Sequence, residues 1–181
     1  MKLNDYYLGH NTNDLESALN YLQKAAALSP SNGIILNNMA IADYLSGDLA
    51  AAQTKFDASA NASVQPVNQN YNTGALSILN GDYSKAAQLM SGQNCDYNTA
   101  LVKLLQKDYN AAKASLDCID NVDAKTAYLK AVLAARMKVE EGVYSNLATA
   151  IDLDASYKKT AKRDAEFKRY RHSDRFKQLV K

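Results

Sequence analysis

Small and large apolar residues recur along this chain at helical spacing, and each such stretch begins just after a short polar phrase. The four phrases are Asn13-Asp14-Leu15, Gly47-Asp48-Leu49, Gly81-Asp82-Tyr83 and Lys107-Asp108-Tyr109. Consecutive phrases begin 34, 34 and 26 residues apart. An alanine and then a large apolar residue follow at steps of three and four, as Ala18 and Leu22, Ala52 and Phe56, Ala86 and Met90, and Ala112 and Leu116. Because residues at these spacings share one face of a helix, each phrase predicts the start of an amphipathic helix.

A second helical pattern precedes each of the last three phrases. Its matching members are Asn37-Asn38-Met39-Ala40, Tyr71-Asn72-Thr73-Gly74 and Tyr97-Asn98-Thr99-Ala100. The small residue that ends each member would let the two helices of a hairpin approach closely. A fifth, more divergent unit begins near Tyr128 and continues through Val143 and Leu147. The sequence therefore predicts antiparallel helix pairs in tandem.

Together these features resemble the tetratricopeptide repeat family over nearly the whole chain. The 34-residue period, the Gly-Asp-Tyr turn, the small–large–small helix face and the closing Leu28-Ser29-Pro30 are the family's pattern. The chain departs from it in two short units and in the column where tryptophan is usual, which holds Leu36, Asn70, Asp96 and Ala127. The resemblance implies an all-α fold, a right-handed superhelical α-solenoid of antiparallel helix pairs, in a C-terminal segment of a larger bacterial protein of this family.

The repeat also predicts how the chain is divided. About five helix pairs are expected at residues 1–32, 33–66, 67–92, 93–123 and 124–157. Residues 158–181 are expected to form basic capping helices, because the last repeat would otherwise expose its apolar face. The apolar contacts of this cap would be Phe167, Tyr170, Phe176 and Leu179. Residues 1–10 are too few for a full first helix, so we expect the chain to begin inside a repeat and to contact further repeats upstream.

Composition agrees with a helical fold and adds an asymmetry of charge. The chain has seven glycines and two prolines, few for a sheet of many strands. No stretch approaches the roughly 20 apolar residues of a membrane span, so no span is expected. Residues 158–181 hold ten lysines and arginines against three acidic residues, a net charge of +7, which leaves −5 for the rest of a chain of net charge +2. The basic end is either a solvated cap face or a surface for phosphate-rich partners.

The sequence offers little material for catalysis. Its two histidines, His10 and His172, lie near opposite ends, and no Cys-x-x-Cys or Gly-rich phosphate loop occurs. The aspartates of the repeated phrases are expected to bind free backbone N–H groups at helix starts, which accounts for them without a catalytic role. We therefore expect no enzyme activity, no cofactor, no metal and no small-molecule substrate.

Resemblance to the family places a partner-binding groove along the first helix of each pair. Tyrosine there would give amphipathic contact area at low entropic cost, which suits a protein or peptide partner. The groove residues expected from the resemblance are Asn37, Ile41, Tyr44, Tyr71, Ile78, Tyr97, Leu101, Leu104 and Tyr128. The alternative is that these tyrosines pack against the neighbouring repeat. The cationic residues with which chaperone-binding members grip a terminal carboxylate are absent, so such a ligand is not expected.

Two cysteines fall at the ends of the fourth expected pair. Cys95 opens its first helix and Cys118 closes its second. Antiparallel packing brings these ends together, so the two thiols could form a disulfide; the alternative is two small buried apolar side chains. A disulfide would favour the periplasm or cell envelope over the cytoplasm, and the sequence leaves the compartment open.

Two function classes remain after these considerations. The first is a non-catalytic scaffold that presents a concave groove to a peptide or helix of a partner protein within a larger assembly. The alternative is a protein that binds nucleic acid or an anionic surface through its basic C-terminal cap. The acidic body and the lack of aromatic residues alternating with basic ones make nucleic acid the less expected partner.

Overall fold

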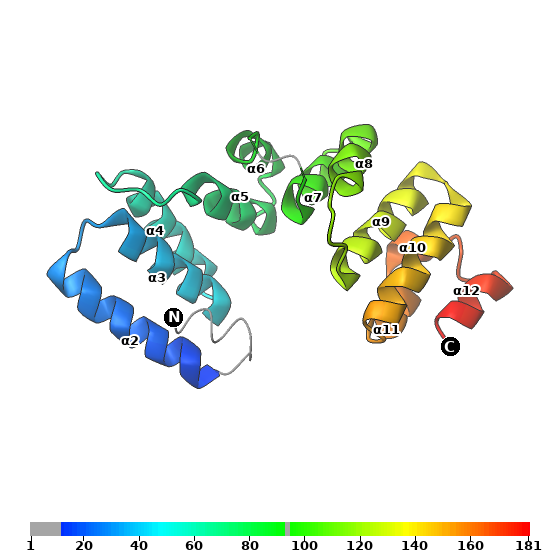
Figure 1. The fold of residues 1–181 in the computed structure, drawn as a ribbon, viewed down its shortest axis with the longest axis horizontal. Helices are drawn as coiled ribbons and strands as arrows, with labels where there is room; N and C mark the ends of the chain where they lie inside the picture. Colours follow the sequence, from blue (N-terminus) through cyan, green and yellow to red (C-terminus); the bar gives the residue numbers. More distant parts are fainter. Residues whose placement is uncertain (1–11, 93–94) are drawn as a thin grey trace. The chain divides into compact units, whose positions relative to one another are not determined.

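The computed structural model describes residues 12–92 and 95–181, and its regular structure is entirely helical (Figure 1). Eleven α-helices and one 3-10 helix occur in these two ranges, and neither range contains a β-strand. The predicted all-α class is confirmed. The expected incomplete first helix, at residues 1–10, lies outside the described residues. No helix in the described ranges is both long and apolar enough to cross a membrane.

The chain divides into two compact units, residues 1–90 and residues 91–181. The helices of the N-terminal unit are α2 (Thr12–Leu28), α3 (Gly33–Ser46), α4 (Leu49–Ala60), α5 (Gln69–Leu79) and α6 (Tyr83–Leu89). Those of the C-terminal unit are α7 (Tyr97–Leu105), α8 (Tyr109–Asp117), α9 (Ala124–Met137), α10 (Glu140–Leu153), α11 (Tyr157–Arg163), η1 (Ala165–Phe167) and α12 (Asp174–Leu179). Residues 158–181 therefore belong to the C-terminal unit together with the two helix pairs before them.

Helices that follow one another in the chain pack as pairs within each unit. The pairs are α3 with α4, α5 with α6, α7 with α8, and α9 with α10. Helix α2 packs against α3, α4 against α5, and α8 against α9, so each unit is a stack of neighbouring helices. The connections inside the pairs are two or three residues long, which forces the paired helices to run antiparallel (Figure 1).

The four turns inside the pairs have the same backbone geometry. Each contains one residue in the left-handed region, and the next residue donates its N–H to the carbonyl five positions earlier at 2.9 Å. This pattern is the Schellman motif, which closes the first helix of the pair. The left-handed residues are Gly47 (φ 87°), Gly81 (φ 76°), Lys107 (φ 66°) and Lys138 (φ 61°).

The residue after each left-handed position opens the second helix of the pair. Asp48, Asp82 and Asp108 each accept a hydrogen bond from a backbone N–H three residues later, at 2.9 to 3.0 Å. The prediction that these aspartates bind free N–H groups is confirmed. In the fourth turn this position is Val139, whose side chain makes no such bond. The polar phrase is therefore a device that ends one helix and begins the next.

Small residues let the paired helices approach closely. Ala40, Ala100 and their partners across the pair, Ala52 and Ala112, are all fully buried. At Gly74 an added Cβ would lie 2.9 Å from Cγ of Met90, so α5 tolerates only glycine against the end of α6 without rearrangement. The predicted role of these small residues is thus met by the packing.

The C-terminal unit has one continuous apolar core that reaches from α7 to α12. It includes Phe167, Tyr170 and Phe176, which are 0%, 6% and 2% exposed, and Leu179 packs at its edge. These are the four apolar contacts predicted for the end of the chain, and they are confirmed. The basic end is consequently held by the same core as α9 and α10.

Candidate partner-binding surface

In the N-terminal unit, the residues predicted for the groove divide into packed and partly accessible ones. Asn37 is 4% exposed, and its Oδ1 accepts a hydrogen bond of 3.0 Å from Nδ2 of Asn72, which ties α3 to α5. Ile41 packs against the core of this unit, and Ile78 is buried. Tyr44 is 37% exposed. Asn37 and Ile78 therefore contribute to packing rather than to an accessible wall.

In the C-terminal unit, Leu104 is 2% exposed and lies inside the core, so it cannot contact a partner. Tyr97 and Leu101, both on α7, are partly buried at the edge of that core. The ammonium of Lys125 lies 5.1 Å from the centroid of the Tyr97 ring. Burial raises the pKa of the Tyr97 hydroxyl, with smaller contributions from Tyr157 and Asp123. Tyr97 therefore keeps its proton at neutral pH and presents an amphipathic ring.

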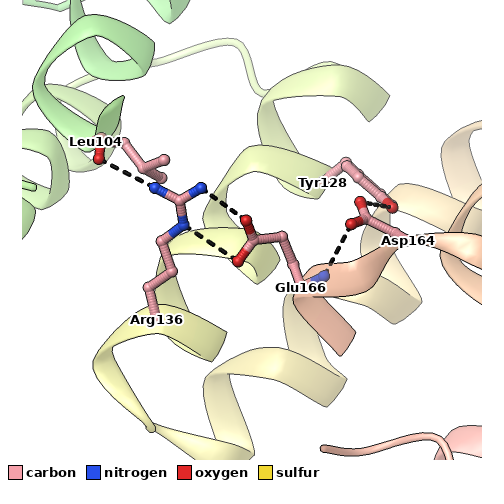
Figure 2. A network of polar contacts seen from close by, with 5 residues as sticks. All are labelled: Leu104, Tyr128, Arg136, Asp164 and Glu166. Carbon is pink, nitrogen blue, oxygen red and sulfur yellow. Dashed lines mark hydrogen bonds and ion pairs between the residues drawn. The ribbon is translucent and has the colours of Figure 1, made fainter. Parts of the chain in front are cut away.

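Tyr128 is occupied by the C-terminal segment. Its ring packs against two others, Tyr157 at 4.7 Å between centroids and Phe167 at 5.6 Å and edge-on. Its hydroxyl donates a hydrogen bond of 2.6 Å to Oδ2 of Asp164 (Figure 2). Burial, together with this bond, raises the pKa of the hydroxyl above its ordinary value, so it remains a donor. The Tyr128 side chain therefore packs against a neighbouring element, which is the alternative to a role in the groove.

A second contact fixes the same segment to α9. Arg136 donates two hydrogen bonds to the carboxylate of Glu166, at 2.6 and 3.1 Å, and one of 3.2 Å to the carbonyl oxygen of Leu104 (Figure 2). The bonds to Glu166 raise the pKa of the guanidinium. Asp164 also accepts from the backbone N–H of Glu166 at 2.9 Å. This polar network joins α7, α9 and η1, and sequence spacing gave no signal for it.

An apolar cavity of about 240 Å³ lies elsewhere, among α8, α9 and α10 of the C-terminal unit. Its lining includes Leu116, Leu133, Met137 and Val139, with Lys113 and Lys130 among its polar residues. Val139 is 50% exposed, so apolar surface is open there. The predicted groove residues do not include any of these side chains. The sequence signal that could have indicated this cavity is Val139, an apolar residue at the position where the other three turns have aspartate.

Cys95 and Cys118 form a disulfide in the structure, with their Cα atoms 5.2 Å apart. The bridge ties the residue just before the N-cap of α7 to the C-cap of α8. Both residues are exposed, so they are not two small buried apolar side chains. Within this unit the bridge closes the shorter helix pair, because α7 and α8 have only nine residues each.

The disulfide leads to a direct chemical prediction. We expect no alkylation of the native chain without reductant and two alkylated thiols after reduction, measured by intact mass. Reduction should lower the free energy of unfolding by about 3 kcal/mol, since the bridge closes a loop of about 24 residues. The Cys95→Ser/Cys118→Ser variant serves as the control, because reductant should leave its stability unchanged. Two thiols that are alkylated without reductant would contradict the bridge.

The described residues hold no cluster of three or more histidine, cysteine, aspartate or glutamate side chains placed to bind a metal ion. His172 is exposed at the C-terminal end, and His10 lies outside the described residues. Comparison with known proteins gives no further assignment: no protein-family model and no curated protein matches this chain.

Proposed function

We propose that this protein is a non-catalytic scaffold that binds a peptide or helix of a partner protein. The binding surface would be the first-helix faces of successive helix pairs, and the pairs would form a right-handed superhelix of the tetratricopeptide type. We also propose that the protein has no active site. It rests on the geometry of the helix pairs and on the side chains that their packing leaves accessible.

The observation that carries the proposal is the shared geometry of the four turns. Because each turn ends one helix and starts the next in the same way, equivalent positions recur on successive first helices. Such a surface is formed before a partner arrives, so little conformational entropy is lost on binding. Tandem helix pairs of this kind are suited to extended recognition surfaces.

The packing narrows the proposed surface. Asn37, Ile78 and Leu104 are buried, and Tyr128 contacts the C-terminal segment. The proposed binding surface therefore does not include these four residues. The residues that remain partly or substantially exposed are Ile41, Tyr44, Tyr71, Tyr97 and Leu101. In the C-terminal unit the centre of the proposed contact is therefore the α7 pair Tyr97 and Leu101, whose ring and aliphatic side chain suit an apolar anchor of a peptide.

The test uses the full chain as bait for a phage-displayed random peptide library. We expect the chain to select peptides that bind measurably by fluorescence anisotropy. The Tyr97→Ala/Leu101→Ala variant should bind them at least tenfold more weakly, since truncating anchor residues typically costs about 2 kcal/mol.

The control variant is Lys113→Ala, which removes an exposed side chain of α8 and its ion pair with Asp117. It should bind the same peptides as the unaltered chain does. Far-ultraviolet circular dichroism must show equal helix content in all three proteins. Undiminished binding by the Tyr97→Ala/Leu101→Ala variant would show that the first-helix face is not the binding surface.

A further inference from the structure

The basic residues of the C-terminal segment are largely without carboxylate partners. Of its ten lysines and arginines, Arg175 pairs with Glu141 and Lys177 pairs with Asp174. The other eight form no ion pair with the described carboxylates: Lys158, Lys159, Lys162, Arg163, Lys168, Arg169, Arg171 and Lys181. The surface of the C-terminal segment, residues 158–181, therefore keeps most of its positive charge.

Two of the three acidic residues of the same segment are engaged by residues outside it. Asp164 accepts a hydrogen bond from Tyr128, and Glu166 binds Arg136, which lies outside the segment. Asp174 is the third acid and lies 3.5 Å from Lys177 in an exposed pair. Such an exposed ion pair contributes at most about 1 kcal/mol, so Lys177 can still bind other anions.

Four of these cations converge on one cavity. The cavity has a volume of about 520 Å³ and lies between α11, the segment after η1, and α12. Its lining consists of Lys162, Arg171, Lys177 and Lys181, over the buried apolar residues Phe176 and Val180. The lining contains no acidic side chain. The cavity is open to solvent, and the charge of its side chains suits a multivalent anion.

The guanidinium of Arg171 is held in place at this cavity and is incompletely bonded. Its Nη2 donates to the backbone carbonyl oxygen of Asp164, which fixes the side chain without neutralising it. Its Nε is enclosed and has no hydrogen-bond partner among the described residues. Because Nε is enclosed, a ligand in the cavity would meet the guanidinium through its other nitrogens, which carry the same positive charge.

We propose that this cavity binds a phosphate group, through Lys162, Arg171 and Lys177. Arginine presents a planar fork of donors that matches phosphate oxygens, and the two lysines add mobile point charges. The phosphate could belong to a free phosphorylated small molecule or to a lipid headgroup, because both present the same group. Single-stranded nucleic acid fits less well, since Phe167, Tyr170 and Phe176 are buried and offer no ring on which a base could stack.

The experiment measures binding of inorganic pyrophosphate to the full chain by isothermal titration calorimetry at low and moderate salt. The test variant is Lys162→Gln/Lys177→Gln, which removes two charges from the cavity. The control is Lys168→Gln/Arg169→Gln, which removes two exposed charges of the same segment that do not line the cavity. We expect at least a tenfold loss of affinity in the test variant and less than a threefold loss in the control.

A second arm separates the two sources of phosphate. Vesicles of phosphatidylcholine with and without phosphatidylglycerol are sedimented with the same three proteins. Saturable pyrophosphate binding that depends on Lys162 and Lys177 supports the site with a free ligand, and vesicle binding with the same dependence supports it with a lipid. Equal losses in both variants, or no saturable binding in either arm, overturns the proposal. Duplex DNA that binds all three proteins alike, without pyrophosphate binding, overturns it as well.

Discussion

Replacing Gly33 by alanine is expected to destabilise the N-terminal unit by about 3 kcal/mol, because the added Cβ has no space. It would lie 2.3 Å from the carbonyl oxygen of Val64, 2.9 Å from Cβ of Ala62 and 3.0 Å from the carbonyl oxygen of Ser59. Two of these atoms belong to the backbone, so a side-chain rotation cannot relieve the clash. The start of α3 or the segment after α4 has to move.

This movement would also disturb a buried polar network. The Ser59 hydroxyl donates to the carbonyl oxygen of Gly33 at 2.7 Å and lies 2.6 Å from Oε1 of Gln69. Gln69 in turn donates from Nε2 to the carbonyl oxygen of Phe56 at 2.8 Å. Because Ser59 and Gln69 are buried, a lost bond here leaves a polar group without a partner and adds to the cost.

The measurement is urea unfolding followed by circular dichroism. Gly92→Ala, in the C-terminal unit, is the control for a glycine replaced without a clash, since no atom lies within 4 Å of its added Cβ and its φ lies outside the left-handed region. Its free energy of unfolding should change by about 0.5 kcal/mol or less. If the two alanine variants unfold at the same urea concentration, the result would contradict the close packing described at the start of α3.

Replacing Phe167 by alanine is expected to cost the C-terminal unit about 3 to 5 kcal/mol, the range for a large aromatic residue removed from a core. The Phe167 side chain is fully buried, meets the Tyr128 ring edge-on, and lies 6.0 Å from the Phe176 ring. The truncation would open a cavity between α9 and the C-terminal segment. The loss should appear as a lower urea midpoint with helical structure retained at zero denaturant.

Phe167→Leu is the companion variant, because it keeps most of the apolar volume. It should cost less than about 1.5 kcal/mol. A large difference between leucine and alanine shows that the residue fills space in the core. A loss below 1 kcal/mol in the alanine variant would instead mean that the C-terminal segment is not part of this core.

Local turn chemistry explains which elements the sequence predicted well. The Gly-Asp phrases combine a left-handed residue with a helix N-cap, and both functions are visible in residue type. In Lys107-Asp108 only the aspartate indicates its function, because lysine does not favour the left-handed region. The turn at Lys138 and Val139 has the same geometry but neither glycine nor aspartate. It was therefore found only through the apolar pattern around it.

Burial of individual groove residues could not be predicted, because it depends on what a distant segment covers. Spacing places Tyr128 and Tyr97 on equivalent helix faces, and both are partly buried, but the Tyr128 ring also packs against the rings of Tyr157 and Phe167. Leu104 was likewise predicted for the groove and is buried in the core that α7 shares with α8 and α9. Helical periodicity reports which residues share a face, and tertiary packing decides which of them a partner can reach.

The central claim is that successive first helices form the partner-binding surface. Hydrogen exchange of the full chain, alone and with a library-selected peptide, tests it directly by mass spectrometry. The account predicts slower exchange in peptides from α7, which carries Tyr97 and Leu101, and less change in α8 and α10. Protection confined to α8 and α10 would contradict the claim and place binding at the cavity lined by Leu116, Leu133 and Met137.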